Sequence, residues 1–174
     1  MKVYYWIEPV KIGTKRLELF TAVSSSRLIM SGLDDKEKLL NQLHTIVRRY
    51  LPEYEVTEQK EPNLDIIKEF QEYFNGERRN FTFSLWQLGT QFQLRVWRAL
   101  LDIPYGQTCS YSDIAEQIGC LKGQRAVGLA NNKNPLGIVV PCHRVIGKNG
   151  HLVGYASGLG NKSMLLDLEN RRAE

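Results

Sequence analysis

The sequence lacks the features that mark secreted, membrane-spanning and zinc-binding proteins. It holds only three cysteines, Cys109, Cys120 and Cys142, an odd number that argues against a disulfide framework and favours free thiols. It has neither a Cys-x-x-Cys nor a His-x-x-x-His pair, so we expect no metal site. No apolar run is long enough to span a membrane, and the apolar start is too short for a signal peptide. We therefore expect a cytoplasmic protein with no membrane partner.

Charge is unevenly distributed along the chain, whose formal net charge is +4. Residues 1–89 contain 13 Lys/Arg and 13 Asp/Glu, whereas residues 90–174 contain 10 Lys/Arg and 6 Asp/Glu. The basic excess therefore lies in the second half, which favours a polyanionic partner such as a nucleic acid. A solvated surface with a modest excess explains the same numbers, so charge alone leaves both interpretations open.

The hydrophobic pattern changes from strand-like to helical near the middle of the chain. In the first half it predicts strands over 2–10, 16–23, 27–30 and 81–85, and helices over 34–50 and 63–74. In the second half it predicts helices over 90–101, 111–118, 124–131 and 161–172, with a short strand-like segment at 138–140. We predict an α/β N-terminal domain over 1–85, built from a small sheet with helices, and a mainly α-helical C-terminal domain over 90–174.

Two short helices in the second half form a helix-turn-helix pattern, 111–118 followed by 124–131. The pattern is weak alone, because pairs of short helices are common. Arg125 begins the second helix and is followed by the small residues Ala126 and Gly128. Such a helix face suits close approach to a DNA backbone, and it equally suits tight packing on a neighbouring helix with Arg125 in solvent.

Cys142 is the candidate nucleophile. It follows an aliphatic run and Pro141, a setting in which a cysteine is usually a small buried hydrophobic residue. The polar neighbours His143 and Arg144 change that interpretation, because burying them is costly unless they are paired, and a basic group beside a thiol favours the thiolate. Adjacent residues of a strand point to opposite faces, so His143 assists Cys142 only if the chain turns at Pro141 or a water bridges them.

A base of this kind needs an acidic partner to orient it. Glu169, in the last predicted helix, is a candidate, and Asp167 is its competitor. Spacing does not choose between them.

The segment Pro141-Cys-His-Arg-Val145 resembles the signature of the O6-alkylguanine-DNA alkyltransferases, also called methylated-DNA–protein-cysteine methyltransferases. The resemblance extends in order and spacing from about residue 70 to residue 170, whereas residues 1–65 resemble the family only in the order of their elements. The matching segments include Thr90-x-Phe92, Val96-Trp97, Ile103-Pro-Tyr-Gly106, Ser110-Tyr111, Arg125-Ala-Val-Gly128, Asn134-Pro135, Gly154-Tyr155, Gly158-Leu159 and Leu165–Glu169.

The resemblance implies a function in DNA repair. The alkyl group of O6-alkylguanine in double-stranded DNA, with O4-alkylthymine as a further candidate substrate, would pass irreversibly to Cys142, once per molecule. The target base would be flipped out of the duplex, and Arg125 would act as an arginine finger that fills the gap. We expect no cofactor and a monomeric protein.

The resemblance also implies roles for particular residues. His143 would act as a base through a water, oriented by Glu169, while Asn134 would brace the active-site turn and Tyr111 would hydrogen-bond and help protonate the flipped guanine. The guanine pocket would be lined by Tyr111, Val145, Tyr155, Ala156 and Ser157. The DNA contacts would come from Tyr111, Arg125, Ala126 and Gly128.

The chain departs from the family's usual pattern at two positions. Ala156 stands where a hydroxyl residue is frequent, and Gly137 stands where some members carry proline at the pocket rim. Two other classes of function remain alternatives. An alkyltransferase-like DNA-binding protein lacks the acceptor cysteine, and a Cys–His hydrolase turns over repeatedly and needs no DNA.

Overall fold

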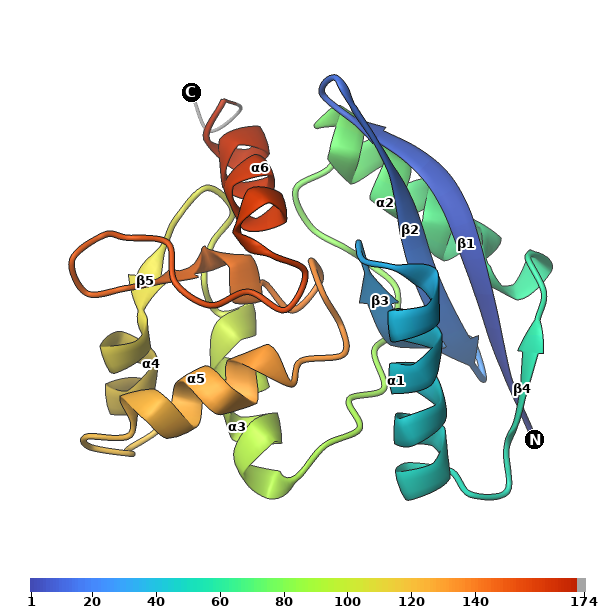
Figure 1. Cartoon of the computed structure of the whole chain (residues 1–174), viewed down its shortest axis with the longest axis horizontal. Helices are drawn as coiled ribbons and strands as arrows, with labels where there is room; N and C mark the ends of the chain where they lie inside the picture. Colours follow the sequence, from blue (N-terminus) through green and yellow to red (C-terminus); the bar gives the residue numbers. More distant parts are fainter. Residues whose placement is uncertain (172–174) are drawn as a thin grey trace. The chain divides into compact units, whose positions relative to one another are not determined.

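The computed structural model describes residues 1–171, whose internal contacts divide into two compact units (Figure 1). The first unit is Met1–Leu88 and the second begins at Gly89. The first holds a small mixed sheet with helices and the second is mostly helical, so the predicted fold class is confirmed. That 1–85 and 90–174 are separate functional domains stays a prediction. No helix within residues 1–171 is long and apolar enough to cross a membrane.

The first unit is built on a four-stranded sheet with the order β3-β2-β1-β4. Its strands are β1 (Lys2–Ile12), β2 (Lys15–Ser24), β3 (Arg27–Gly32) and β4 (Glu55–Glu58). The first three are antiparallel neighbours and were predicted, because long runs of β-branched and aromatic residues form them. The fourth pairs parallel to β1 and was missed, because four residues give too little alternation.

The predicted strand over 81–85 is wrong. Only one bridge forms there, between Leu28 and Leu85, with hydrogen bonds that join Leu28 to the backbone on either side of Leu85. Phe81 and Phe83 instead pack their rings on Phe70, with centroids 4.9 and 5.9 Å away. The aromatic residues that suggested a strand therefore belong to a side-chain cluster.

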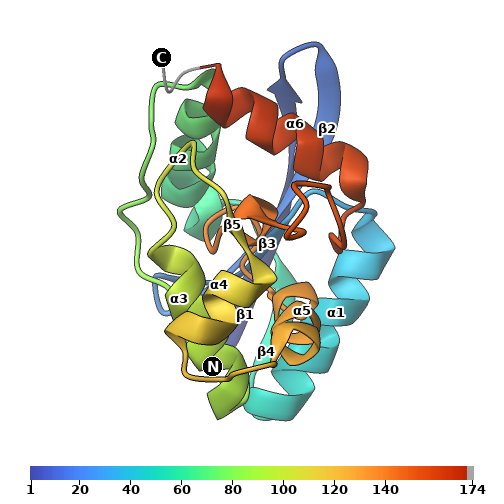
Figure 2. The ribbon, with the colours of Figure 1, turned by 90° about the vertical axis from the view of Figure 1, so that its left-hand side faces the viewer.

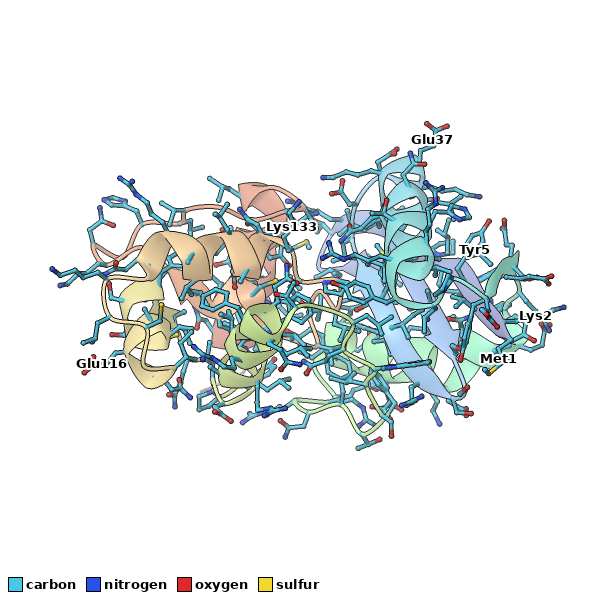
Figure 3. The ribbon with its side chains drawn as sticks, turned by 90° about the horizontal axis from the view of Figure 1, so that it is seen from below. Met1, Lys2, Tyr5, Glu37, Glu116 and Lys133 are labelled. Atoms are coloured by element: carbon cyan, nitrogen blue, oxygen red, sulfur yellow. The ribbon has the colours of Figure 1, made fainter. Side chains whose placement is uncertain are left out.

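Two helices cover opposite faces of the sheet (Figures 1 and 3). Helix α1 (Lys36–Tyr50) begins after Asp35, whose carboxylate accepts the Lys38 amide, and α2 (Leu64–Asn75) ends at Gly76 in a left-handed conformation. A single 3-10 turn, η1 (Glu61–Asn63), precedes α2. Both helices bury apolar residues at helical spacing, as their sequence predicted.

The second unit contains four helices and two very short strands within its described part. The helices are α3 (Gln91–Leu101), α4 (Tyr111–Gln117), α5 (Gln124–Asn132) and α6 (Leu159–Asn170). All four were predicted within about two residues, apart from the predicted end of α6 at Arg172, which lies outside the described residues. Strands β5 (Cys109–Ser110) and β6 (Val145–Ile146) pair in parallel and were missed, because two residues carry no periodicity.

The predicted strand-like segment at 138–140 is wrong, because the chain turns there. Ile138 adopts φ = 75°, a left-handed conformation that is rare for a β-branched residue. This turn leads directly into η2 (Cys142–Arg144), the single 3-10 turn that carries the candidate nucleophile.

Helices α4 and α5 lie side by side in both ribbon views (Figures 1 and 2). Ser110 and Asp113 form the reciprocal capping box that begins α4. The buried Trp97 of α3 donates its indole N–H to the Ala130 carbonyl of α5 at 2.9 Å. This buried hydrogen bond joins α5 to α3.

Candidate active site

Cys142 begins η2 and is only 6% exposed. Burial raises the pKa of its thiol, whereas hydrogen bonding to Asn134, the charge of Lys162 and hydrogen bonding to Tyr155 act in the opposite direction. Burial dominates, so at neutral pH the sulfur carries its proton and needs a base to become a nucleophile.

The turn before Cys142 is braced by Asn134. Its carboxamide N–H donates to the Val140 carbonyl at 2.9 Å, and its carbonyl accepts the Leu136 amide at 3.0 Å. The same turn contains the strained Ile138, and a conformation of that kind persists only where its surroundings hold it. Asn134 therefore fixes the backbone that presents the sulfur.

Glu169 of α6 is the hub of a buried ionic network. Its carboxylate lies 2.7 Å from His143 Nε2 and accepts hydrogen bonds from Arg144 Nε and Nη2, each at 2.9 Å. It also accepts the Gly106 amide at 3.1 Å. These partners outweigh burial and hold the pKa of Glu169 well below its usual range. The competing Asp167 is exposed, so the structure brings Glu169, and not Asp167, to His143.

His143 is completely buried, and burial lowers the pKa of its imidazole. It is therefore neutral at pH 7. Because the ionised Glu169 only accepts hydrogen bonds, the imidazole proton resides on Nε2. The Nδ1 lone pair is left as an acceptor, and that atom has no hydrogen-bond partner within residues 1–171. His143 is thus in the tautomer and charge state of a general base.

Lys162 lies among the site residues and was missed by sequence reasoning. It is fully buried in α6, and its ammonium donates to the carbonyls of Val145, Val153 and Gly154 at 2.5, 2.9 and 3.3 Å. Burial lowers its pKa to about 8. Lys162 ties the 153–154 segment to the strand that follows the nucleophile. Its position three residues before the buried Leu165 and seven before Glu169 was the available signal.

The predicted pocket residues lie on both sides of this lysine. The Tyr111 hydroxyl donates to the Val153 carbonyl at 3.0 Å, and the ammonium of Lys162 lies 5.9 Å from the centre of the Tyr111 ring. Lys162 also lies 6.0 Å from the Tyr155 ring, and burial raises the pKa of Tyr155 well above 10.0. Val145 is buried in β6. Ala156 is exposed and Ser157 half-buried, in the loop before α6.

Three of the four predicted DNA contacts lie on α5, and the fourth, Tyr111, begins α4. Arg125 and Ala126 are exposed, and the half-buried Gly128 faces the ring of Tyr111. A Cβ at Gly128 would lie 3.9 Å from that ring, so the helix and the tyrosine approach each other closely. Among residues 1–171, no cluster of His, Cys, Asp and Glu side chains could hold a metal ion.

Comparison with known proteins gives close relatives over most of the chain. Residues 91–171 match the family model described as 6-O-methylguanine DNA methyltransferase, DNA binding domain. A methylated-DNA–protein-cysteine methyltransferase of Methanosarcina acetivorans is 46% identical over 82% of this chain and 90% of its own length. The corresponding protein of Mycobacterium leprae is 53% identical over 62% of this chain. This chain spans 66% of that relative's length, just under two thirds.

Solved structures agree with these relatives. The crystal structure of O6-methylguanine methyltransferase from Mycobacterium tuberculosis superimposes with a TM-score of 0.83 at 40% identity, over 99% of this chain and 95% of that one. A structure of the same mycobacterial protein in complex with DNA matches with a TM-score of 0.77 at 36% identity, over 99% of this chain and 94% of that one.

Proposed function

This chain belongs to the methylated-DNA–protein-cysteine methyltransferase family, and from that premise we propose that it repairs O6-alkylguanine in double-stranded DNA by moving the alkyl group to Cys142. One observation carries the proposal. A buried thiol, a neutral imidazole oriented by Glu169 and a buried ammonium lie in one unit of the fold.

The reaction would be a displacement at the first carbon of the alkyl group. The bond between the Cys142 sulfur and that carbon forms as the bond between the carbon and guanine O6 breaks. The thiol proton leaves towards His143, through the water that the family resemblance implies, and guanine takes up a proton as it departs. The net change moves one alkyl group to sulfur and one proton to guanine, so no cofactor is required.

The product explains why we expect a single turnover. A thioether has no good leaving group, so Cys142 stays alkylated and the protein is consumed. Mixing the protein with excess O6-methylguanine duplex should therefore remove one methyl group per molecule. An alkyltransferase-like binding protein would remove none, and a Cys–His hydrolase would remove none here but turn over many times on an ester or amide.

Duplex DNA is proposed as the partner because a relative of this fold has been solved in complex with DNA. The exposed Arg125 and the small residues of α5 give a helix face that can approach a sugar–phosphate backbone closely. The target atom lies inside the duplex, so the base has to be flipped out before it can reach a buried sulfur. Arg125 would then occupy the position that the base has left.

Arg125→Ala should separate base flipping from chemistry. We expect the variant to lose about tenfold to hundredfold in repair of duplex O6-methylguanine, because unstacking costs a few kcal/mol that the arginine offsets. The loss on free O6-benzylguanine should be far smaller, since a free base needs no flipping. Single-turnover rates on both substrates measure the difference. Equal losses would mean that Arg125 supports the fold instead.

The state of His143 predicts the pH dependence of transfer. His143 accepts a proton only when neutral, and burial keeps its pKa below 6.5. The single-turnover rate with free O6-benzylguanine should therefore fall as pH decreases and reach half of its maximum only below pH 6.5. Circular dichroism at each pH excludes unfolding as the cause. A half-maximal rate at or above pH 6.5 would contradict this role for His143.

A further inference from the structure

A concavity of about 300 Å³ runs between α5 and the segment 153–154. No acidic side chain lines it within the described part of the chain. Its lining residues are Tyr111, Gln124, Arg125, Gly128, Asn132, Val153 and Gly154. Of these lining residues only Arg125 is charged, and it is a cation, so the groove does not repel an anionic occupant.

The helix is open towards this groove because of one glycine. Gln124, Gly128 and Asn132 are four residues apart and share one face of α5. The missing side chain at Gly128 leaves a gap between the two carboxamides, and the ring of Tyr111 lies behind it. The α5 side of the groove therefore has the carboxamide of Gln124 at one end and that of Asn132 at the other.

Gly154 opens the opposite wall. Its φ of +52° is a conformation that side chains rarely adopt. A Cβ placed there would lie 3.7 Å from the Tyr111 hydroxyl and 3.8 and 3.9 Å from the two terminal atoms of the Asn132 carboxamide. The hydroxyl and the carboxamide thus converge on one space that the protein leaves open. The Tyr111 hydroxyl already donates to the Val153 carbonyl, whereas the carboxamide of Asn132 belongs to an exposed residue and lies beside this space.

The two ends of the groove differ in what they would contact if the proposed function holds. Arg125 would stand inside the duplex in place of the flipped base, and Tyr111 would touch the flipped guanine. The backbone of the flipped nucleotide has to connect these two places, and the groove lies between them.

We propose that this groove holds the phosphodiester of the flipped nucleotide and that the Asn132 carboxamide N–H donates to one of its phosphate oxygens. The inference rests on the proposed function and deepens it, because it assigns a backbone-binding residue next to Tyr111. Amide side chains are common phosphate donors, and such a contact fixes the position of a nucleotide without reading its base.

Four substrates with the same O6-benzyl group test this assignment. They are a duplex oligonucleotide, the single strand, O6-benzyl-2′-deoxyguanosine and the free base O6-benzylguanine. Asn132→Ala should slow transfer from both oligonucleotides by about tenfold more than from the nucleoside and the base, because only the oligonucleotides carry a phosphodiester. Arg125→Ala should slow only the duplex reaction to that extent, since a single strand has no gap to fill.

Asn132→Asp is the second variant, because it keeps the shape of the side chain and so guards against misfolding. It replaces a donor by a charge that repels phosphate, and it should slow the oligonucleotides more than Asn132→Ala does. Asn41→Ala, at an exposed position of α1 in the other unit, is the matched control.

Three outcomes would overturn the assignment. Equal losses on all four substrates would make Asn132 part of the base pocket. A loss on the nucleoside as large as that on the oligonucleotides would place the contact at the sugar. No loss on any substrate would mean that Asn132 is not part of the site. Failure of the proposed function looks different, because the unaltered protein would then leave the benzyl group on every substrate.

Discussion

Cys142→Ala is expected to abolish alkyl transfer from duplex DNA and from free O6-benzylguanine alike. Cys142 is the proposed acceptor, His143 serves as its base, and Lys162 is a protonated donor to three carbonyls at neutral pH. Affinity for duplex DNA should change by no more than about threefold, since a buried thiol makes no phosphate contact. The removed sulfur should cost about 1 kcal/mol of stability.

The other two cysteines provide the controls. Cys109 and Cys120 are both half-buried free thiols, and burial raises the pKa of Cys109 to about 11, so it is a poor nucleophile at neutral pH. Cys109→Ala and Cys120→Ala should keep the transfer rate of the parent. Gel-shift titration measures DNA binding, and methyl removal from an oligonucleotide measures transfer. Activity that survives in Cys142→Ala would show that the acceptor is elsewhere.

Glu169→Ala should give the largest loss of stability of any single substitution in the site. It leaves the buried Arg144 without its counter-ion and His143 without its partner, and removing one member of a buried ion pair costs about 3–5 kcal/mol. Asp167→Ala, two residues earlier on an exposed position of α6, should change stability by less than about 0.5 kcal/mol. Urea denaturation of both variants measures the difference, and similar midpoints would contradict the role of Glu169 as a hub.

Glu169→Gln adds a test in pH. The pKa of Glu169 is depressed in the folded state, so its ionic contribution to stability is complete above the unfolded value near 4.5 and declines as pH falls below it. The stability advantage of the parent over Glu169→Gln should therefore be constant near neutrality and shrink in acid. An advantage that grew below pH 4.5 would contradict this assignment.

Local signals predicted most elements of this fold. Long strands with β-branched residues and helices with capping residues and periodic apolar positions appear where the sequence places them, as at Asp35, Gly76 and Ser110. Elements that depend on distant pairing were missed. Strands β5 and β6 form because Cys109 and Val145 pair although they are far apart in the sequence. A two-residue strand has no pattern from which such pairing could be predicted. The aromatic residues at 81–85 led to a wrong strand prediction, because aromatic rings pack into side-chain clusters as well as onto sheets.

For the site, too, the sequence identified some residues, whereas others became evident only from the structure. Motif resemblance named His143, Asn134 and Glu169 beside the candidate nucleophile Cys142. Spacing alone left Glu169 and Asp167 open, and the structure places Glu169 against His143. Lys162 was missed because a lysine in an amphipathic helix is ordinarily solvated, and its burial depends on three carbonyls from other segments. Asn132 was missed because its convergence with Tyr111 and Gly154 depends on how two helices and a loop meet in space, not on sequence spacing.

Mass spectrometry after reaction with duplex O6-methylguanine DNA tests the central claim most directly. The intact protein should gain the mass of one methyl group and no more, even with excess DNA, and the peptide that contains Cys142 should carry it. The DNA should then contain guanine at the repaired position. A methyl group on Cys109 or Cys120, or more than one lesion repaired per protein molecule, would contradict single-turnover transfer to Cys142.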